Sequence, residues 1–344
     1  MEKQDPKTWS KSENPNKMRI ITLEEHFATS AFMEGPGQQL KGLAQAAHAH
    51  PQMPAPMPRF IDPSQLIDQL MDIDDRRVAD MDAAGIDAQV LSLTSPGVEQ
   101  LGAIEAMEIA RDANDRLADA VQHHPSRFAG LAALPTAAPD IAADELERMV
   151  REHGFKGAVI NGHSQGRYLD DEFFWPILER AEALQVPLFL HPTHPPQPVI
   201  ETSYKGNYAP EVTDLLANAA WGWHILSGAF DEYPRLQFVI GHLGEALPFM
   251  LPRIDLVLPT KVTKLDRSIG AYLRENLHYT FSGFNYTQSF LDLFLQVGVD
   301  RIMFSADYPY SSMELAHAFL DQLPVSTADK NRIAHSNAEH LLRL

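Results

Sequence analysis

Short apolar runs alternate with segments of helical period along most of this chain. Runs such as VPLFL and LQFVI are apolar at consecutive positions, which is typical of parallel strands buried on both faces. Between the runs, apolar residues recur at helical spacing, for example over 64–84 and 98–123. The runs with the strand pattern lie at 18–23, 88–93, 128–133, 157–160, 187–190, 236–240, 277–281 and 301–305. Strand and helix alternating eight times predicts an α/β fold, a closed (β/α)8 TIM barrel.

The segment 29–63 departs from this rhythm, because it is rich in Pro, Gly, Met and His. A loop of this length inside a compact domain is usually a lid or a binding loop. We therefore interpret 29–63 as a lid-like insertion after the first strand, and its His48 and His50 as only a weak signal for metal binding. Residues 1–17 are polar and are expected to form an N-terminal arm, with a single barrel domain over 18–344.

Composition narrows the class of partner. The 344 residues carry a formal net charge of −18, which repels phosphates and anionic lipids. A small molecule is therefore expected as the partner, rather than nucleic acid or a membrane. The polar N-terminus lacks the apolar core of a signal peptide, so a cytoplasmic location is expected. The chain has no cysteine, which leaves His, Asp and Glu as the available metal ligands.

Acidic and imidazole side chains follow the apolar runs at the ends where a barrel gathers its catalytic groups. These strand-end positions hold Glu24-Glu25-His26, Asn161-Gly162-His163, His191 with His194, His242, and Asp307. Alternation sends residues i and i+2 to one face, so Glu24 and His26 can both point inward while Glu25 points away. His191 and Asp307 would complete a set of two imidazoles and two carboxylates. Such a set suits one Zn²⁺ or Mn²⁺ ion, with positions left for water or substrate, although a single histidine after a strand is more often structural.

His242 lies in the run IGHLGE, where Gly241 lets the backbone come close to the site. A helix that starts near Glu245 would bring its N-terminal dipole there. An imidazole at this place can act as an acid or base or orient a substrate, with Glu245 fixing its tautomer. The alternatives are a fourth ligand or a core histidine for His242, and a simple helix-start carboxylate for Glu245.

Five stretches of the chain resemble a known family: LEEHFA, INGHSQGRYLDDEFF, PLFLHP, FDEYPRLQFVIGHLGEALPFM and SADYPY. They are similar to the amidohydrolase-related decarboxylases that act on ortho-hydroxylated aromatic carboxylates, among them the 5-carboxyvanillate and gamma-resorcylate decarboxylases. Aminocarboxymuconate semialdehyde decarboxylase is a more distant member. The resemblance runs from about residue 19 to 344 and implies a barrel of the amidohydrolase type. It implies the metal ligands Glu24, His26, His191 and Asp307.

The resemblance also implies roles around the metal. His242 with Glu245 is implied as the acid/base or substrate-binding pair, and Tyr310 as a substrate contact. Hydrolytic members of the wider superfamily often bridge two metals with a carboxylated lysine after the fourth strand. Here Asn161 stands at that end and Lys156 at the opposite end, so one metal is implied.

An arginine grips the substrate carboxylate in the carboxyvanillate branch. Arg59 is the candidate in the matching region, although its spacing to Arg76 and Arg77 departs from the family pattern. We count Asn161 and His194 with Arg59 and Tyr310 as candidate substrate-binding residues.

The implied activity is that of a carboxy-lyase, the metal-dependent, non-oxidative decarboxylation of a hydroxybenzoate or carboxyvanillate type substrate. Asp307 is the candidate proton donor, with His242 holding the carboxylate or relaying the proton, and these two roles are interchangeable. Two rivals stay open: a metal-dependent hydrolase or hydratase acting on an enol or ring-cleavage product, and a silent barrel that binds an aromatic acid. The family further implies a homodimer or homotetramer, with Trp221, Trp223 and Phe230 either at an interface or in the core.

Overall fold

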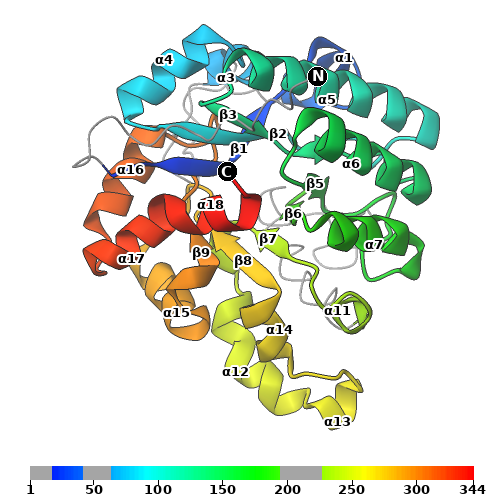
Figure 1. The fold of residues 1–344 in the computed structure, drawn as a ribbon, viewed down its shortest axis with the longest axis vertical. Helices are drawn as coiled ribbons and strands as arrows, with labels where there is room; N and C mark the ends of the chain where they lie inside the picture. Colours follow the sequence, from blue (N-terminus) through cyan, green and yellow to red (C-terminus); the bar gives the residue numbers. More distant parts are fainter. Residues whose placement is uncertain (1–17, 42–62, 194–226) are drawn as a thin grey trace, which may run out of the picture.

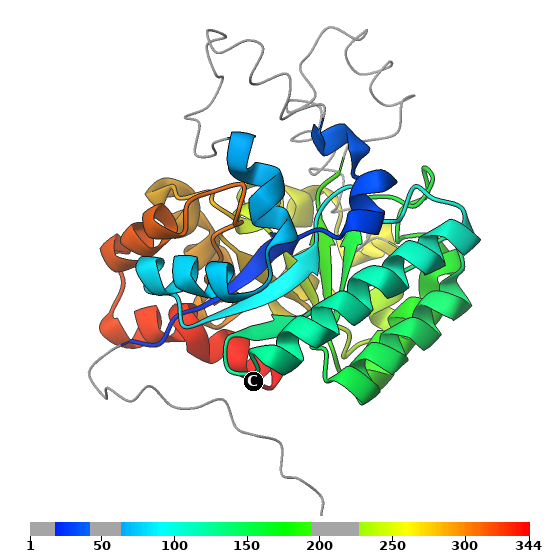
Figure 2. The ribbon, with the colours of Figure 1, turned by 90° about the horizontal axis from the view of Figure 1, so that it is seen from above.

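A computed structural model describes residues 18–41, 63–193 and 227–344, with strands at the centre and helices around them (Figures 1 and 2). The strands are β1 (Ile21–Phe27), β2 (Ala88–Leu93), β3 (Phe128–Gly130), β4 (Ala132–Ala133), β5 (Ala158–Asn161), β6 (Leu188–His191), β7 (Phe238–Ile240), β8 (Leu277–Thr280) and β9 (Ile302–Met303). They pair in parallel and in chain order, β1 to β3 in one sheet and β4 to β9 in another.

The two sheets join through one interrupted strand. β3 and β4 are separated by Leu131, whose N–H donates to the Leu91 carbonyl of β2 at 2.9 Å. The next amide, of Ala132, donates in the other direction to the Gly157 carbonyl beside β5, also at 2.9 Å. A parallel bridge between Leu23 and Ser305 links the first strand to the segment that follows the last. The strands thus follow the order that the sequence predicts for a (β/α)8 TIM barrel.

Helices connect successive strands and cover the outside of the barrel (Figure 2). The α-helices are α1 (Ser30–Glu34), α3 (Pro63–Met71), α4 (Asp75–Ala84), α5 (Ala103–His123), α6 (Pro139–His153), α7 (Trp175–Leu184), α11 (Ala229–Glu232), α12 (Leu247–Val257), α13 (Thr260–Thr263), α14 (Ile269–Glu275), α15 (Thr287–Val297), α16 (Met313–Gln322), α17 (Thr327–Asn331) and α18 (Asn337–Leu342). Short helical turns are η1 (Glu172–Phe174), η3 (His242–Gly244), η4 (Val299–Arg301) and η5 (Arg332–Ser336). None of the helices in the described ranges is both long and apolar enough to cross a bilayer.

Several element boundaries differ from the sequence-based expectation. The helix predicted over 64–84 is two helices, because Asp74 is extended (φ −126°, ψ −153°) and its N–H donates to the Asp72 carboxylate at 3.1 Å. Short acidic side chains bond to nearby backbone in this way and compete with helix formation. The helix predicted over 98–123 begins only after Gly102, which is extended. β1 continues to Phe27, four residues beyond the predicted run 18–23, so the EEH motif lies inside the strand.

The barrel interior is apolar at one end. Alternate residues of the strands point inward there and pack against Ala338 and Leu342 of α18, which closes this end. They include Ile21, Leu23, Val90, Val159, Phe189, Val239 and Met303. A larger apolar layer separates the strands from the surrounding helices. Polar chemistry is therefore left to the opposite end, the barrel mouth, where the strands finish.

Some of the predicted features lie outside the described residues. These are the arm 1–17, most of the insertion 29–63 with His48, His50 and Arg59, and the residues His194, Trp221 and Trp223. Phe230 is described: it is 2% exposed, and its ring lies 5.5 Å from that of Phe238 and 5.9 Å from that of Tyr272. Phe230 is therefore a core residue, not an interface residue.

Candidate active site

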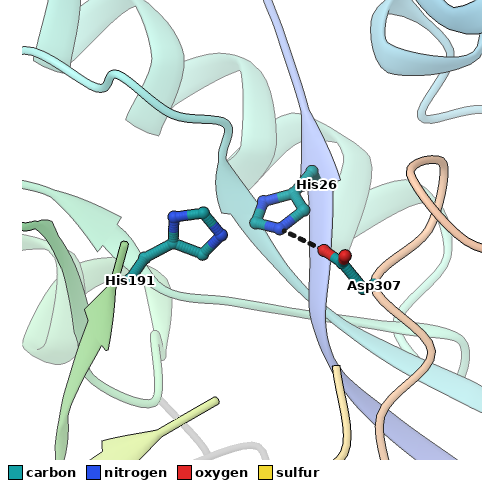
Figure 3. A group of neighbouring side chains, drawn as sticks. All are labelled: His26, His191 and Asp307. Carbon is teal, nitrogen blue, oxygen red and sulfur yellow. Dashed lines mark hydrogen bonds and ion pairs between the residues drawn. The ribbon is translucent and has the colours of Figure 1, made fainter. Parts of the chain in front are cut away.

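Three of the predicted metal ligands meet at the barrel mouth (Figure 3). His26 comes from β1, His191 is the last residue of β6, and Asp307 follows β9. One ligand atom from each lies within 4.8 Å of the others. His26 Nε2 is 3.1 Å from Asp307 Oδ1, and the two imidazole rings are 4.7 Å apart, edge to face. Residues distant in sequence thus present two imidazole nitrogens and a carboxylate to one point.

Glu24 lies beside this group. Its backbone is left-handed (φ 64°), at a register shift of β1 between Thr22 and Glu25. Its Oε2 accepts hydrogen bonds from Thr280 Oγ1, at 2.7 Å, and from Ser282 Oγ. Its Oε1 lies 3.9 Å from His191 Nε2 and is buried without a hydrogen-bond donor among the described residues. One carboxylate oxygen is therefore held by hydroxyl groups, and the other is left for another partner.

The protonation states of these residues fit a divalent cation. Burial raises the pKa of Asp307 to about 7 and also raises the pKa of Glu24, since low-dielectric surroundings disfavour an uncompensated carboxylate. Burial also lowers the pKa of His26 to about 4 and that of His191 below its usual value, so both imidazoles are neutral. Two neutral imidazoles and two buried carboxylates are what a divalent ion needs.

The tautomer of His191 also fits the binding of a divalent cation. Its Nδ1 lies 2.8 Å from the Pro192 carbonyl oxygen, which can only accept, so the proton is on Nδ1. The Nε2 lone pair then faces Glu24 and His26. This lone pair is available to a metal ion, and so is Glu24 Oε1, which accepts no hydrogen bond from the described residues. Such nitrogen and oxygen donors fit Zn²⁺ or Mn²⁺.

His242 begins a strained turn after β7. His242, Leu243 and Glu245 all have a positive φ, of 49°, 56° and 54°. Such conformations cost free energy and persist where the surrounding structure fixes them. The His242 N–H donates to Ser282 Oγ at 3.0 Å, and its Nδ1 forms an ion pair with Glu245 Oε1 at 3.1 Å. The helix expected near Glu245 begins slightly later, as α12 at Leu247.

The charge of His242 follows from its neighbours. Burial lowers the pKa of a histidine, but the carboxylates of Glu245, Glu24 and Asp307 outweigh that effect and raise the pKa of His242 to about 10. These carboxylates favour the imidazolium form of His242, a cation at the mouth of an acidic protein. A substrate carboxylate is the kind of group that such a cation attracts.

Gly241 permits the close approach that its sequence context suggested. A Cβ at this position would lie 2.4 Å from Glu24 Oε1 and 2.7 Å from Ser282 Oγ, closer than real contacts allow. The backbone of the turn after β7 thus rests directly on the Glu24 carboxylate.

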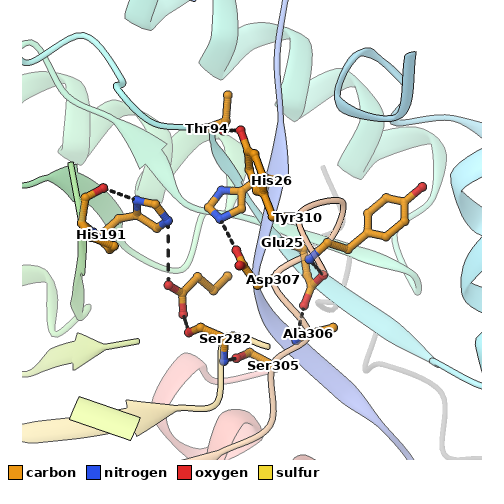
Figure 4. A network of polar contacts seen from close by, with 12 residues as sticks. Glu25, His26, Thr94, His191, Ser282, Ser305, Ala306, Asp307 and Tyr310 are labelled. Atoms are coloured by element: carbon orange, nitrogen blue, oxygen red, sulfur yellow. Dashed lines mark hydrogen bonds and ion pairs between the residues drawn. The ribbon is translucent and has the colours of Figure 1, made fainter. Parts of the chain in front are cut away.

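Tyr310 and Asn161 flank the site. The Tyr310 hydroxyl pairs with Thr94 Oγ1 at 2.6 Å, and its ring lies 5.4 Å from that of His26 (Figure 4). Asn161 ends β5 in register with His191, and its Nδ2 and N–H both donate to Glu99 Oε1, at 3.2 and 2.7 Å. No lysine stands at this strand end, and Lys156 instead donates to the Arg343 carbonyl at 3.2 Å, near the closed end of the barrel.

Sequence reasoning missed the polar residues that hold the site in place. Ser282 donates to Glu24, and its own N–H donates to Ser305 Oγ at 2.5 Å (Figure 4). Thr280 and Ser282 stand two positions apart in LHYTFSG, the same alternation that singles out Glu24 and His26, so this signal was present in the sequence. His163, in contrast, follows β5 but accepts the Gly166 N–H at 2.9 Å in a turn and is not part of the three-residue group.

The amidohydrolase family model matches residues 46–344. The chain belongs to the amidohydrolase family. Among its relatives is a gamma-resorcylate decarboxylase of Polaromonas sp., 38% identical over 345 residues, which span 94% of this chain and 98% of the relative.

Two solved structures extend the comparison. One is a 5-carboxyvanillate decarboxylase of Novosphingobium aromaticivorans with manganese and 4-hydroxy-3-methoxy-5-nitrobenzoic acid, with a TM-score of 0.83, 34% identity and coverage of 95% of this chain and 96% of that one. The other is a dihydroxybenzoic acid decarboxylase of Polaromonas sp. with manganese and the inhibitor 2-nitroresorcinol, with a TM-score of 0.81, 36% identity and coverage of 95% and 98%. Homologous structures thus bind manganese, and this chain has a His/His/Asp group that can hold one metal ion.

Proposed function

We propose that the protein is a metal-dependent carboxy-lyase that removes CO2 from an ortho-hydroxylated aromatic carboxylate. The observation that carries the proposal is the convergence of His26, His191 and Asp307 at the barrel mouth, within 4.8 Å of one another. The decarboxylases that match nearly the whole chain at 38% identity support the same reaction.

Glu24, His26, His191 and Asp307 would hold one divalent ion, and both Mn²⁺ and Zn²⁺ suit this donor set. When bound, such an ion acts as a Lewis acid toward the phenolate and carboxylate oxygens of the substrate. The ligands in the two related structures fit this substrate class, because each carries a nitro group ortho to a hydroxyl. A nitro group is planar and has two oxygens, as a carboxylate has.

In the proposed reaction, Asp307 protonates the ring carbon that bears the carboxylate. A new C–H bond forms there and the ring loses its aromaticity. The C–C bond to the carboxylate then breaks, its electron pair returns to the ring, and CO2 leaves. Asp307 suits this role because burial raises the pKa of its carboxyl and so favours its protonated form.

His242 would hold the substrate carboxylate through its positive charge. The ion pair with Glu245 at 3.1 Å fixes the imidazole and keeps it protonated. We assign Tyr310 and Asn161 to the wall of the substrate site, because Tyr310 lies against His26 and Asn161 lies next to His191. Arg59 and His194 stay proposals from the sequence alone.

The experiment that tests this function is a panel of hydroxybenzoates and 5-carboxyvanillate, incubated with protein loaded with Mn²⁺ or Zn²⁺. Ultraviolet spectra and CO2 release report turnover. The proposal predicts a decarboxylated phenol from at least one acid with a hydroxyl ortho to the carboxylate, and no product from isomers without it. Turnover of no ortho-hydroxylated acid by the metal-loaded protein would contradict it.

A hydratase is the second candidate. A 2-keto-4-carboxy-3-hexenedioate hydratase of Sphingobium sp. is 32% identical over 153 residues, but these span only 42% of this chain. The same side chains can activate water. Incubation in ¹⁸O-labelled water distinguishes the two reactions, because a hydratase incorporates solvent oxygen into the organic product and a decarboxylase does not.

We further propose that the protein forms a homodimer or homotetramer through α12, α13 and α15, which lie along one edge of the molecule (Figure 1). α12 packs against α15, and both carry large apolar side chains exposed to solvent. These side chains include Phe249 (72% exposed), Leu256 (78%), Val257 (53%), Leu291 (38%) and Leu295 (81%). Several such residues on one edge are typical of a surface that is covered by another chain.

A further inference from the structure

Glu25 is fully buried on the face of β1 that points away from the metal site (0% exposed). Its two carboxylate oxygens each accept a backbone hydrogen bond from the loop after β9 (Figure 4). Oε1 accepts from the Ala306 N–H at 2.9 Å, and Oε2 accepts from the Tyr308 N–H at 3.0 Å. These two amides belong to the residues directly before and after Asp307.

Asp307 needs such support. Its backbone is left-handed (φ 66°), a conformation that is unfavourable for a residue with a side chain. The direction of its carboxylate, toward His26 Nε2 at 3.1 Å, depends on this backbone conformation. A carboxylate that binds the amides on both sides of Asp307 fixes the peptide planes that set this direction.

Arg77 of α4 stands behind the same elements. It is fully buried, and its Nη1 donates to the His26 carbonyl at 2.8 Å. Its guanidinium lies 4.8 Å from the centroid of the Tyr308 ring, and the Tyr308 hydroxyl donates to Asp80 of α4 at 2.9 Å. Burial raises the pKa of Glu25 to about 7, while the two backbone hydrogen bonds and the positive charge of Arg77 favour its ionised form. Helix α4 therefore anchors both β1 and the loop that carries Asp307.

We propose that Glu25, supported by Arg77, is a positioning residue that fixes the Asp307 carboxylate for metal binding. This inference rests on the proposed role of Asp307 in holding the cation. It assigns the middle residue of the EEH motif a function of its own. Glu24 and His26 face the ion, while Glu25, on the other side of the strand, binds the backbone on both sides of Asp307.

Two variants test the proposal. Glu25→Gln keeps the size of the side chain but replaces one acceptor by an NH2 group that opposes a backbone N–H. Glu25→Asp keeps the charge opposite Arg77 but is one methylene too short to reach both amides. We expect the Mn²⁺ dissociation constant to rise about 10–100-fold in Glu25→Gln, the usual effect of losing a partner that orients a ligand, and by less in Glu25→Asp.

The matched control is Glu145→Gln. Glu145 is equally buried (1% exposed) and accepts from Asn114 Nδ2 at 2.8 Å and from Arg148 Nη2 at 2.7 Å, between α5 and α6. We expect this variant to lose thermal stability with an unchanged Mn²⁺ dissociation constant. The free-ion signal in electron paramagnetic resonance measures binding without any substrate, and circular dichroism reports folding of each metal-free variant.

The outcomes separate the inference from the proposed function. If wild-type protein binds no Mn²⁺, or if Asp307→Asn binds it as wild type does, the proposed metal site itself is wrong. If wild type binds and Asp307→Asn does not, but both Glu25 variants bind within twofold of wild type, the positioning role alone is overturned. If Glu25→Gln does not fold, an unchanged constant for Glu25→Asp overturns the inference equally.

Discussion

Replacing Gly241 with alanine tests whether the place of Glu24 sets the chemistry of the site. Alanine adopts the backbone of Gly241 (φ −73°, ψ −177°) without strain, so the effect is steric. The new Cβ would lie 2.4 Å from Glu24 Oε1, whereas ordinary van der Waals contact begins at 3.4 Å. The Glu24 carboxylate must therefore shift by about 1 Å, which disturbs the hydrogen bonds that it accepts from Thr280 and Ser282.

A displacement of this size is large for a metal ligand. Misplacing a functional group by about 1 Å can cost roughly 100-fold in rate, and disturbing the support of a ligand typically costs about 10–100-fold in metal affinity. We expect Gly241→Ala to lose activity and Mn²⁺ affinity in these ranges. Electron paramagnetic resonance titration measures the affinity, and CO2 release from the best substrate measures kcat/KM.

Gly102→Ala is the control for this experiment. Gly102 has a similar φ (−67°), and a Cβ there would meet nothing within 4 Å. It should match wild type in both assays. If Gly241→Ala remains folded and also binds Mn²⁺ within twofold of wild type, the crowding of Glu24 has no consequence and the reasoning is refuted.

Three further predictions follow from the site and the surface. His242→Asn should lower kcat about 10²–10⁴-fold while Mn²⁺ still binds. The control is His278→Asn, at a buried histidine that pairs with Gln237 and Arg301, which should leave kcat near wild type. A large loss of Mn²⁺ binding in His242→Asn would instead make His242 a metal ligand. Dialysis against a chelator should abolish turnover. Mn²⁺ at about 100 times its dissociation constant should restore turnover and add about 2.7 kcal/mol to the free energy of unfolding. Full activity in metal-free protein would exclude a metal-dependent reaction. Leu295→Glu should reduce the mass in light scattering toward the 38.4 kDa of one chain, while Ile104→Glu, at an equally exposed residue of α5 (79%), should not.

The sequence could predict the strand-end chemistry because chain order determines position in a parallel barrel. His26 and Asp307 are far apart in sequence, yet both follow strands whose carboxyl ends meet at one mouth. The alternation of side chains along β1 also predicts correctly that Glu24 and His26 share a face while Glu25 does not. These features follow from local periodicity and from the order of elements alone.

Other features depend on contacts that no local pattern encodes. The left-handed turn at His242 is stabilised by Ser282, 40 residues further along the chain. The partners of Glu25 lie 281 and 283 residues away, so alternation indicates that its side chain points outward but not what it binds. The break between α3 and α4 was also missed, because the apolar spacing continues through Asp72 and Asp74.

We expect one cation to bind where His26, His191 and Asp307 meet. Anomalous diffraction at the manganese absorption edge, from crystals of the Mn²⁺-loaded protein, measures this directly. We expect one strong peak at coordination distance, roughly 2 Å, from an atom of each of these three residues and of Glu24. A strong peak elsewhere in the chain, or no peak at the barrel mouth in protein that decarboxylates its substrate, would contradict it.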